Sequence, residues 1–495
     1  MKILDADQIR EWDNMTISKQ GITSLDLMER AALSCKYYLL KKHLKQNYII
    51  FCGPGNNGGD GLALARLLYE EKINVQVITV WNDGTNFSTE NISNQKRLPK
   101  KISVLKFDSN FSIPFHAAET IIIDAILGNG QNRPLDGIYK KAVEWINQTS
   151  IEVLSIDIPT GIYEVCHKKE NTAIEADKTL CFEIPKLSFF FPENDRYIGE
   201  WEILTIGSDP EFALQADGIF SYLTPEEIQH SKKKRRKYSH KGTFGSAYLF
   251  AGQVGMAGAA ILASEACLRS GAGKLIIRTP KACLSILQSA IPEAICDPDP
   301  NEEVLSTFPS DLTQYQSVGI GPGIGRSPLT KALIWKLLRN GVPNLVLDAD
   351  ALNIISEEGW QSQIPPGAVI TPHVREFERL WGISENHFQR LMLARNKAIE
   401  LKIVIVIKGA HTAIISPDGQ VSFNTTGNPG LAKAGTGDVL TGMITGILAQ
   451  GYQVTEGVKR AIFMHGLAAD ALTLERDEAS ILASDIVKYI GISKL

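Results

Sequence analysis

Short, almost continuous apolar runs alternate with segments of helical length, and this alternation constrains the fold more than any other feature. In the first half the runs are YIIFC (48–52), VQVITV (75–80), TIIIDAIL (120–127) and EVLSIDIP (152–159), followed by ADKTLCF and GEWEILTIG. In the second half they are GSAYLFAG (245–252), KLIIRTP, SVGIGPG, NLVLDAD, AVITP and IVIVIKG. Strands that are apolar on both faces are typical of parallel sheets covered by helices on both sides. The sequence therefore predicts an α/β protein with a mostly parallel sheet in each half.

The length and a break in this rhythm predict two domains. The chain has 495 residues, which is too many for one ordinary domain. Residues 208–240 are polar and contain the basic run KKKRRK at 232–237. We place the boundary near 215–223, with domains at 1–215 and 224–495. The basic run either binds a phosphate-rich ligand or is a solvated connector, and we favour the connector.

Charge and cysteine content narrow the class of protein. Lys and Arg total 51 against 55 Asp and Glu, a net charge of −4, which argues against a nucleic-acid or membrane-surface partner. No apolar run approaches the ~20 residues that span a bilayer, and the N-terminus lacks an apolar signal segment. The seven cysteines form no CxxC pair. We expect reduced thiols in a cytoplasmic protein.

A glycine-rich loop follows the first strand of the first half. Gly53 to Gly58 matches GxGxxG between a strand and a helix, where backbone N–H groups can approach a phosphate. A nucleotide oxidoreductase and a tight turn without a ligand are the alternatives. The ordinary dinucleotide fold is disfavoured because side chains crowd the loop (Asn56, Asn57, Asp60). The acidic residue expected after the second strand is also poorly placed, since that strand ends in Trp81-Asn82-Asp83.

Polar side chains also follow later strands of the first half. Asn57, Asp124 and Thr160 offer oxygen ligands from neighbouring strand ends, which suit a hard cation. Asp157 has the position of a general base at the sheet edge. A buried Asp that caps the next turn is the alternative for each carboxylate.

Several motifs of the first half together resemble one known family. GNNGGDGL, DAILGNG…RP, DIPTG and ADKTLCFEIPK are similar to the YjeF N-terminal family, the NAD(P)H-hydrate epimerases, over roughly residues 1–215. The resemblance implies a Rossmann-like three-layer sandwich that binds hydrated NADH or NADPH beside a potassium ion. It implies that Asn57, Asp124 and Thr160 are the potassium ligands and that Asp157 faces the reacting ring. The family more often has Thr, Leu and Ser at Asn129, Gln131 and Thr160. The residues implied to hold the substrate are Asn56, Asn57, Gly58, Gly59, Asp60, Gly128, Asn129, Gly130, Gln131, Asn132, Arg133, Pro134 and Asp157.

The second half contains a motif suited to phosphoryl transfer. Gly435-Thr436-Gly437-Asp438 opens a helical segment, where exposed N–H groups form an anion hole. Asp438 is placed to accept a proton from a hydroxyl that attacks phosphorus, and the helix N-terminus should favour its ionised form. An Asp that merely caps the helix is the alternative. The sequence has no Walker A motif, so it is not a P-loop enzyme.

Other loops of the second half support the same interpretation. Lys408 to Thr412 follow a strand and offer cationic and hydroxyl groups to a nucleotide, and GPGIG (321–325) permits close backbone approach. His373 is either a functional residue or an ordinary turn histidine. GMAGAA (255–260) serves either ligand approach or tight helix packing.

The second half resembles a different family. KGTFGSAYLFAG, GMAGAA, GPGIG, LDADALN, TPHVREFERL, KGAHT and NTTGNPGLAKAGTGDVL are similar to the YjeF C-terminal family, the ribokinase-like NAD(P)H-hydrate dehydratases, over roughly 224–495. The resemblance implies dehydration of the S epimer of the hydrate, with ADP or ATP and magnesium. Val374 and Arg375 depart from the usual pattern. The hydrate would contact Gly258, Ala260, Gly323, His373 and Asp438, and the nucleotide would contact Lys408, Gly409, Ala410, His411, Thr412 and Gly437.

The two resemblances together imply one chain with two activities. It would interconvert the R and S hydrates in the first half and dehydrate the S form in the second. Its partners would be small molecules, and we expect a homo-oligomer. Two alternatives stay open: a small-molecule kinase in the second half, and a catalytically silent nucleotide-binding module in the first.

Overall fold

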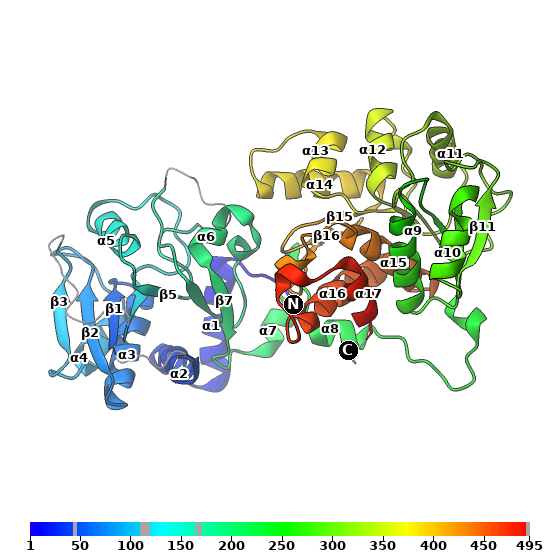
Figure 1. Ribbon diagram of the computed structural model, residues 1–495. Coiled ribbons are helices and arrows are strands. Elements are labelled where there is room, and N and C mark those ends of the chain that lie inside the picture. Colours follow the sequence, from blue (N-terminus) through cyan, green and yellow to red (C-terminus); the bar gives the residue numbers. More distant parts are fainter. Residues whose placement is uncertain (43–46, 109–118, 164, 166–170, 492–495) are drawn as a thin grey trace. The chain divides into compact units, whose positions relative to one another are not determined.

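The computed structural model describes residues 1–42, 47–108, 119–163, 165 and 171–491. The chain divides into two compact units (Figure 1). The first unit is Lys2–Gly218, and the second comprises Ile219–Glu385 and Gln389–Leu495. The division falls between Gly218 and Ile219, within the predicted boundary region 215–223.

The first unit contains a parallel sheet of seven strands. Its order is β3-β2-β1-β4-β5-β6-β7, so the direction of succession reverses between β1 and β4. The crevice at such a reversal, outside the carboxyl ends of the strands, is where ligands bind in open α/β sheets. The strands are β1 (Asn47–Cys52), β2 (Asn74–Thr79), β3 (Ser103–Lys106), β4 (Thr120–Ala125), β5 (Glu152–Ile156), β6 (Lys178–Phe182) and β7 (Glu200–Leu204).

Helices cover both faces of this sheet. Successive residues of a strand point to opposite faces, and in the central strands the residues on both faces are apolar. Ile50 and Ile123 pack with residues of α2 and α3, whereas Phe51 and Ile122 pack with residues of α5. The predicted Rossmann-like three-layer sandwich is thereby confirmed. The helices are α1 (Ala6–Gln20), α2 (Ser24–Lys42), α3 (Asn56–Glu70), α4 (Thr89–Arg97), α5 (Gly137–Asn147), α6 (Asp195–Ile198) and α7 (Pro210–Gln215).

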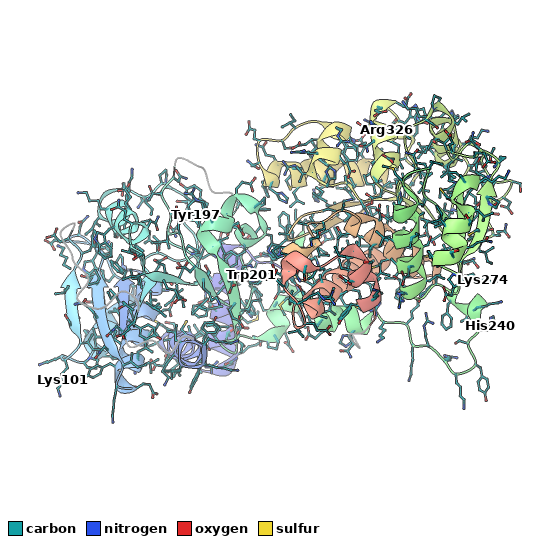
Figure 2. The ribbon with its side chains drawn as sticks, in the orientation of Figure 1. Lys101, Tyr197, Trp201, His240, Lys274 and Arg326 are labelled. Carbon is teal, nitrogen blue, oxygen red and sulfur yellow. The ribbon has the colours of Figure 1, made fainter. Side chains whose placement is uncertain are left out.

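A small apolar cluster closes the β7 side of the sheet. Phe189 and Tyr197 are buried there with Cys181, and Trp201 of β7 packs against them; Figure 2 labels Tyr197 and Trp201. The helix α2 is described as far as Lys42, and residues 43–46 lie outside the described part of the chain.

The second unit contains a sheet of ten strands in the order β11-β10-β9-β12-β13-β14-β15-β16-β17-β8. The pairs β15–β16 and β16–β17 are antiparallel and the other pairs are parallel. The strands are β8 (Phe220–Tyr222), β9 (Ser246–Phe250), β10 (Lys274–Pro280), β11 (Ile295–Asp299), β12 (Ser317–Ile320), β13 (Leu345–Leu347), β14 (Val369–Ile370), β15 (Val404–Ile407), β16 (Ala413–Ile415) and β17 (Val421–Phe423).

The edge strand β8 precedes residue 224, where we expected the second domain to begin. It pairs in parallel with β17, so the second sheet takes up residues that the sequence assigned to the connector. A strand of three residues carries too little periodicity to be recognised from the sequence alone.

Two long helices of the second unit, α9 and α15, pack unusually closely (Figure 1). A Cβ atom on Gly442 would lie 2.0 Å from the carbonyl oxygen of Ala263, and one on Gly446 would lie 2.3 Å from that of Cys267. These glycines one turn apart let the two backbones touch, which fixes the start of α15. The helices are α8 (Pro225–His230), α9 (Ala257–Arg269), α10 (Leu284–Ala290), α11 (Pro328–Arg339), α12 (Ala349–Glu357), α13 (Val374–Trp381), α14 (His387–Leu401), α15 (Thr436–Ala449), α16 (Val454–Leu472) and α17 (Ala483–Tyr489).

The basic run 232–237 is exposed, yet part of it has a defined structural role. Lys233 Nζ donates to the carbonyl oxygens of Gln450 and Gly451 at the end of α15, and Arg235 donates to that of Gly271, beyond α9. Cations at helix C-termini satisfy carbonyls left without helical partners and complement the helix dipole. The run is therefore more than a solvated connector.

Two further expectations concern the state of the cysteines and the presence of membrane-spanning helices. Six cysteines are unpaired thiols and five of these are buried, whereas Cys166 lies outside the described residues. Among the helices that the structure describes, none combines the length and apolarity needed to cross a bilayer.

Candidate active sites

The first unit has a cavity of about 490 Å³ at the topological reversal of its sheet. Loops that follow β1, β4, β5 and β6 form one wall, and α1 forms another. The cavity brings together six predicted substrate residues from three separate segments. These are Asn56, Asn57, Asp60, Gly128, Asn129 and Asp157.

The glycines of the 53–59 loop have two different roles. A Cβ on Gly53 would lie 1.9 Å from the carbonyl oxygen of Ile126, and one on Gly58 would lie 1.8 Å from that of Gly53. Gly55 has open space around it and lines the cavity. The predicted substrate residues Gly58 and Gly59 do not line the cavity, because Gly58 packs within the turn and Gly59 packs against Met28.

The loop 128–134 extends from this cavity into a second one. Gly128 and Asn129 line the first cavity, whereas residues 130–134 line a neighbouring cavity of about 360 Å³. Gln131 spans the loop, because its Nε2 donates to the Gly128 carbonyl at 3.1 Å and its Oε1 accepts from the Gly161 N–H at 2.9 Å. The amide at this position therefore ties the loop to the turn after β5.

Two of the predicted potassium ligands, Asp124 and Thr160, are in direct contact, and the third, Asn57, lines the cavity. Asp124 is fully buried and accepts from the Thr160 hydroxyl at 2.7 Å and the Thr160 N–H at 2.8 Å. Burial raises the pKa of Asp124, and no basic side chain pairs with it among the described residues. The Asn57 amide is buried and neither of its polar atoms has a partner in the described chain. A buried carboxylate without a counter-charge and a buried amide without partners are compatible with a cation held by Asn57, Asp124 and Thr160.

Asp157 occupies a strained position at the end of β5. The strand was expected to reach residue 159 but ends at Ile156, because Asp157 has a φ of 67°. Non-glycine residues in this left-handed region store strain, which concentrates at functional sites. Lys186 Nζ lies 2.8 Å from Asp157 Oδ1, and the lysine side chain is 3% exposed. The buried ion pair holds the Asp157 carboxylate at the cavity wall.

The candidate site of the second unit lies at the carboxyl ends of β13, β14 and β15, beside the start of α15. Lys408 Nζ lies 2.8 Å from Asp348 Oδ1 and 3.9 Å from Glu376 Oε2. Thr441 of α15 donates to Asp348 Oδ2 at 2.6 Å. Asp348 therefore links the lysine to α15, one turn beyond Asp438.

Asp438 sits in the first turn of α15, as the sequence predicted. Its carboxylate makes no hydrogen bond with the described residues, and burial followed by the nearby Asp348 raises its pKa to about 6. We expected the helix N-terminus to favour the ionised form, but the net pKa shift is in the opposite direction, because burial and Asp348 outweigh Lys408. A carboxylate that titrates near neutrality is well matched to proton transfer.

The remaining predicted residues of the second unit differ in their surroundings. Gly323 and Gly258 are partly or fully exposed, but Ala260 is fully buried against Gly252. Gly258 and Ala260 are two residues apart and therefore lie on nearly opposite sides of α9. Ala260 faces the interior and cannot present its side chain to a ligand. The exposed turn of Gly409 and Ala410 connects β15 to β16, beside His411, Thr412 and the start of α15 at Gly437.

His373 is a helix cap in this structure. Its Nδ1 accepts from the Glu376 N–H at 3.3 Å, and the Glu376 carboxylate accepts from the His373 N–H at 2.8 Å. Burial and the nearby Lys408 lower the pKa of His373, so it is neutral at pH 7. The ring remains half-exposed and is placed beside Lys408 by a backbone bridge.

The described residues contain no group of three or more His, Cys, Asp or Glu side chains able to hold a metal ion. This finding does not conflict with magnesium, which usually binds through substrate phosphates and one or two carboxylates.

Sequence reasoning did not assign several residues that the structure places in these sites. Asp348 lies near the end of the run NLVLDAD and Glu376 follows the run AVITP, and a polar residue after a buried strand is the signal that could have identified them. Lys186 lies in the quoted motif FEIPK, and no local pattern shows that it reaches Asp157. Asp13 lies on an amphipathic helix, where a carboxylate ordinarily faces solvent.

The folds and sites define an enzyme of two α/β units, one with a Rossmann-like sheet and one with a half-buried carboxylate at a helix N-terminus. A family model described as YjeF-related protein N-terminus matches residues 24–188, and one described as NAD(P)H-hydrate dehydratase matches 247–491. The bifunctional NAD(P)H-hydrate repair enzyme Nnr of Coxiella burnetii is 32% identical over 98% of both chains. The enzyme of the same name from Thermofilum pendens is 31% identical over 99% of this chain and 95% of its own.

A solved structure of the ADP/ATP-dependent NAD(P)H-hydrate dehydratase from Bacillus subtilis, co-crystallised with ATP and Mg²⁺, is 33% identical. The match covers 55% of this chain and 96% of that chain, with a TM-score of 0.47. The chain belongs to the family of bifunctional NAD(P)H-hydrate repair enzymes. The predicted combination of an epimerase part and a dehydratase part is thereby confirmed.

Proposed function

We propose that the first unit interconverts the R and S hydrates of NADH and NADPH, and that the second dehydrates the S form at the expense of ADP or ATP. The observation that carries the proposal is Asp438, a carboxylate without hydrogen-bond partners at a helix N-terminus, whose pKa of about 6 suits a general base. The two activities belong together chemically, because a stereospecific dehydratase alone would leave one epimer unrepaired.

In the second unit, Asp438 takes the proton of the ring hydroxyl as that oxygen attacks the terminal phosphorus of the nucleotide. The N–H groups at the start of α15 stabilise charge on the phosphoryl oxygens. The new phosphate ester is a better leaving group than hydroxide. Loss of a proton from the neighbouring ring carbon and departure of phosphate then form the double bond of the dihydronicotinamide.

The nucleotide would lie along the turn Lys408 to Thr412, beside Gly437, with magnesium bound mainly through its phosphates. Lys408 would neutralise phosphate charge while Asp348 fixes its position at 2.8 Å. His373, Gly258 and Gly323 would border the hydrate. We further propose that the enzyme is a homo-oligomer. We also propose that it works in a reducing cytoplasm, and the unpaired cysteines support this second proposal.

In the first unit, Asn56, Asn57, Asp60, Gly128, Asn129 and Asp157 would surround the hydrated ring, and residues 130–134 would extend the contact into the neighbouring cavity. Potassium would bind to Asn57, Asp124 and Thr160. When bound, it would balance the buried charge of Asp124 and orient the loops after β4 and β5. Asp157, held by Lys186, would face the reacting carbon.

One assay tests the proposal. The full chain is incubated with mixed hydrate epimers and ADP or ATP, and the return of dihydronicotinamide absorbance is followed. We expect both epimers to be converted and inorganic phosphate to be released. A stable phosphorylated hydrate without restored absorbance would instead favour the alternative of a ribokinase-like small-molecule kinase.

A further inference from the structure

The helix α1 forms a wall of the first-unit cavity that the predicted site residues do not include. Ala6, Ile9, Arg10 and Asp13 all line the cavity. Their spacing of i, i+3, i+4 and i+7 places them on one face of the helix. The other walls come from the loops after the strands, so Asp13 and Asp157 reach the cavity from different elements.

The position of α1 is fixed by Trp12 and Thr16, which flank Asp13 on the helix. Trp12 Nε1 donates to the carbonyl oxygen of Asp209 at 2.6 Å, and the Thr16 hydroxyl accepts from the Asp209 N–H at 3.0 Å. Trp12 also stacks on Phe212 of α7. The helix is thus held in place by contacts that do not involve Asp13, which leaves that carboxylate available to the cavity.

The two carboxylates have contrasting surroundings. Asp157 is paired with the buried Lys186, whose Nζ lies 2.8 Å from Asp157 Oδ1. Asp13 makes no hydrogen bond or ion pair with the described residues. The groups that act on it are Asp157 and Glu183, which disfavour its ionised form, Lys186, which favours it, and Asp60, deeper in the cavity. Burial and Asp157 raise the pKa of Asp13 to about 6. Two carboxyl groups with such different environments are typical of an acid and base pair.

Resting on the proposed epimerase function, we propose that Asp13 is a second catalytic residue of this site, acting on the ring hydroxyl from one wall while Asp157 acts from another. In one direction, the Asp13 carboxyl gives its proton to the hydroxyl oxygen of the hydrate. The carbon–oxygen bond breaks, its electron pair leaves with water, and the lone pair of the ring nitrogen forms a carbon–nitrogen double bond.

Water then adds to the opposite face of the same carbon. The new carbon–oxygen bond forms, the double-bond electrons return to nitrogen, and the Asp157 carboxylate takes the proton of the added water. The substrate is inverted without net gain or loss of atoms. Asp13 has lost one proton and Asp157 has gained one, so solvent exchange or a turnover in the reverse direction resets the pair.

The test uses the full chain with Asp13→Asn and, as a matched control, Glu11→Gln, an exposed carboxylate on the same helix that does not line the cavity. Purified S hydrate is followed by chromatography as it converts to R, without nucleotide, across pH 5–9. Parallel samples in ¹⁸O-labelled water report carbon–oxygen cleavage. Dehydration of S hydrate with ADP or ATP controls for the second unit, and thermal unfolding of each variant controls for the folding of the first.

For Asp13→Asn we expect at least a ~10²-fold fall in epimerisation and in ¹⁸O incorporation. In the wild type the epimerisation rate should decline as the pH rises through about 6, and this decline should disappear in the variant. Dehydration should be unchanged, and Glu11→Gln should behave as wild type. Asp13→Asn within about threefold of wild type, or a persisting titration near pH 6, overturns the assignment while the proposed function stands. Wild-type epimerisation without ¹⁸O incorporation overturns the mechanism, and absence of wild-type epimerisation overturns the proposed function itself.

Discussion

At the scale of single residues, the second unit depends on the protonation of Asp438. Because its pKa is about 6, we expect dehydration to fall as the pH drops below 6, with Asp438 as the titrating group. Asp438→Asn keeps the size of the side chain but cannot accept the proton. Its dehydration rate should fall at least ~10²-fold and lose this pH limb, whereas nucleotide affinity and epimerisation should change little.

The same substitution should stabilise the fold, which separates a catalytic role from a structural one. A carboxyl whose pKa is raised from 3.8 to about 6 on folding destabilises the native state above pH 6. The penalty disappears as the pH falls through 6 toward 3.8. Denaturant unfolding at pH 8 should therefore show Asp438→Asn to be more stable by at most ~3 kcal/mol, with no gain near pH 4. Near wild-type turnover of this variant would contradict the catalytic role of Asp438.

Asp124 permits a second prediction at this scale. It accepts hydrogen bonds from Ser155, Ile126 and twice from Thr160, so Asp124→Ala leaves buried donors unsatisfied, at a cost of about 1–3 kcal/mol each. We expect epimerisation and its potassium dependence to be lost, while dehydration of pure S hydrate persists. An equal loss of both activities would indicate misfolding and contradict the cation assignment.

Whether a candidate site residue could be predicted from the sequence depended on its local context. Asp124, Asp157 and Asp438 were predicted because each follows a recognisable strand or opens a helix with a glycine-rich motif. Lys186 and Asp13 were not assigned, because only the tertiary fold brings them to the cavity. The pKa of Asp438 was misjudged because the sequence shows the helix start but not the burial or the approach of Asp348.

At the scale of elements, the contact between α9 and α15 positions the start of α15. In Gly442→Ala the added Cβ would lie 2.0 Å from the backbone oxygen of Ala263, which cannot move without separating the helices. We expect a loss of about 3 kcal/mol in unfolding free energy, and slower dehydration because Asp438 shifts with α15. Epimerisation should be unaffected.

A helical glycine of α16 supplies the matched control for this prediction. A Cβ on Gly457 would approach the flexible end of Leu448 at 2.7 Å rather than a backbone atom. Gly457→Ala should therefore change stability by no more than about 1 kcal/mol, since alanine also favours the helix. Equal effects of the two substitutions would contradict the account of the α9–α15 contact.

The strand pattern was easier to predict than the edges of the sheets. Central strands such as β1, β4 and β15 are buried throughout and appear as continuous apolar runs. The edge strand β3 is exposed along its length, and β8 and β17 have three residues each. Their pairing depends on neighbours distant in sequence, which local periodicity cannot reveal.

At the scale of the whole molecule, the two units should fold independently, each with its own sheet and core. We expect residues 1–218 and 219–495, expressed separately, to unfold cooperatively and to retain epimerase and dehydratase activity, respectively. A fragment that starts at 224 should melt at a lower temperature, because it lacks β8 and the hydrogen bond from Leu223 N–H to the Phe423 carbonyl. Insoluble fragments, or equal melting temperatures of the fragments 219–495 and 224–495, would contradict this division.

The central claim is that one chain joins two distinct active sites that act in succession. The measurement that tests it most directly is the amplitude of dihydronicotinamide recovery from an equilibrium mixture of hydrate epimers with ADP or ATP. Wild type should restore the whole pool, Asp438→Asn should restore none while still interconverting the epimers, and Asp157→Asn should rapidly restore only the S share. Full and equally fast recovery with Asp157→Asn, or recovery with Asp438→Asn, would contradict the account.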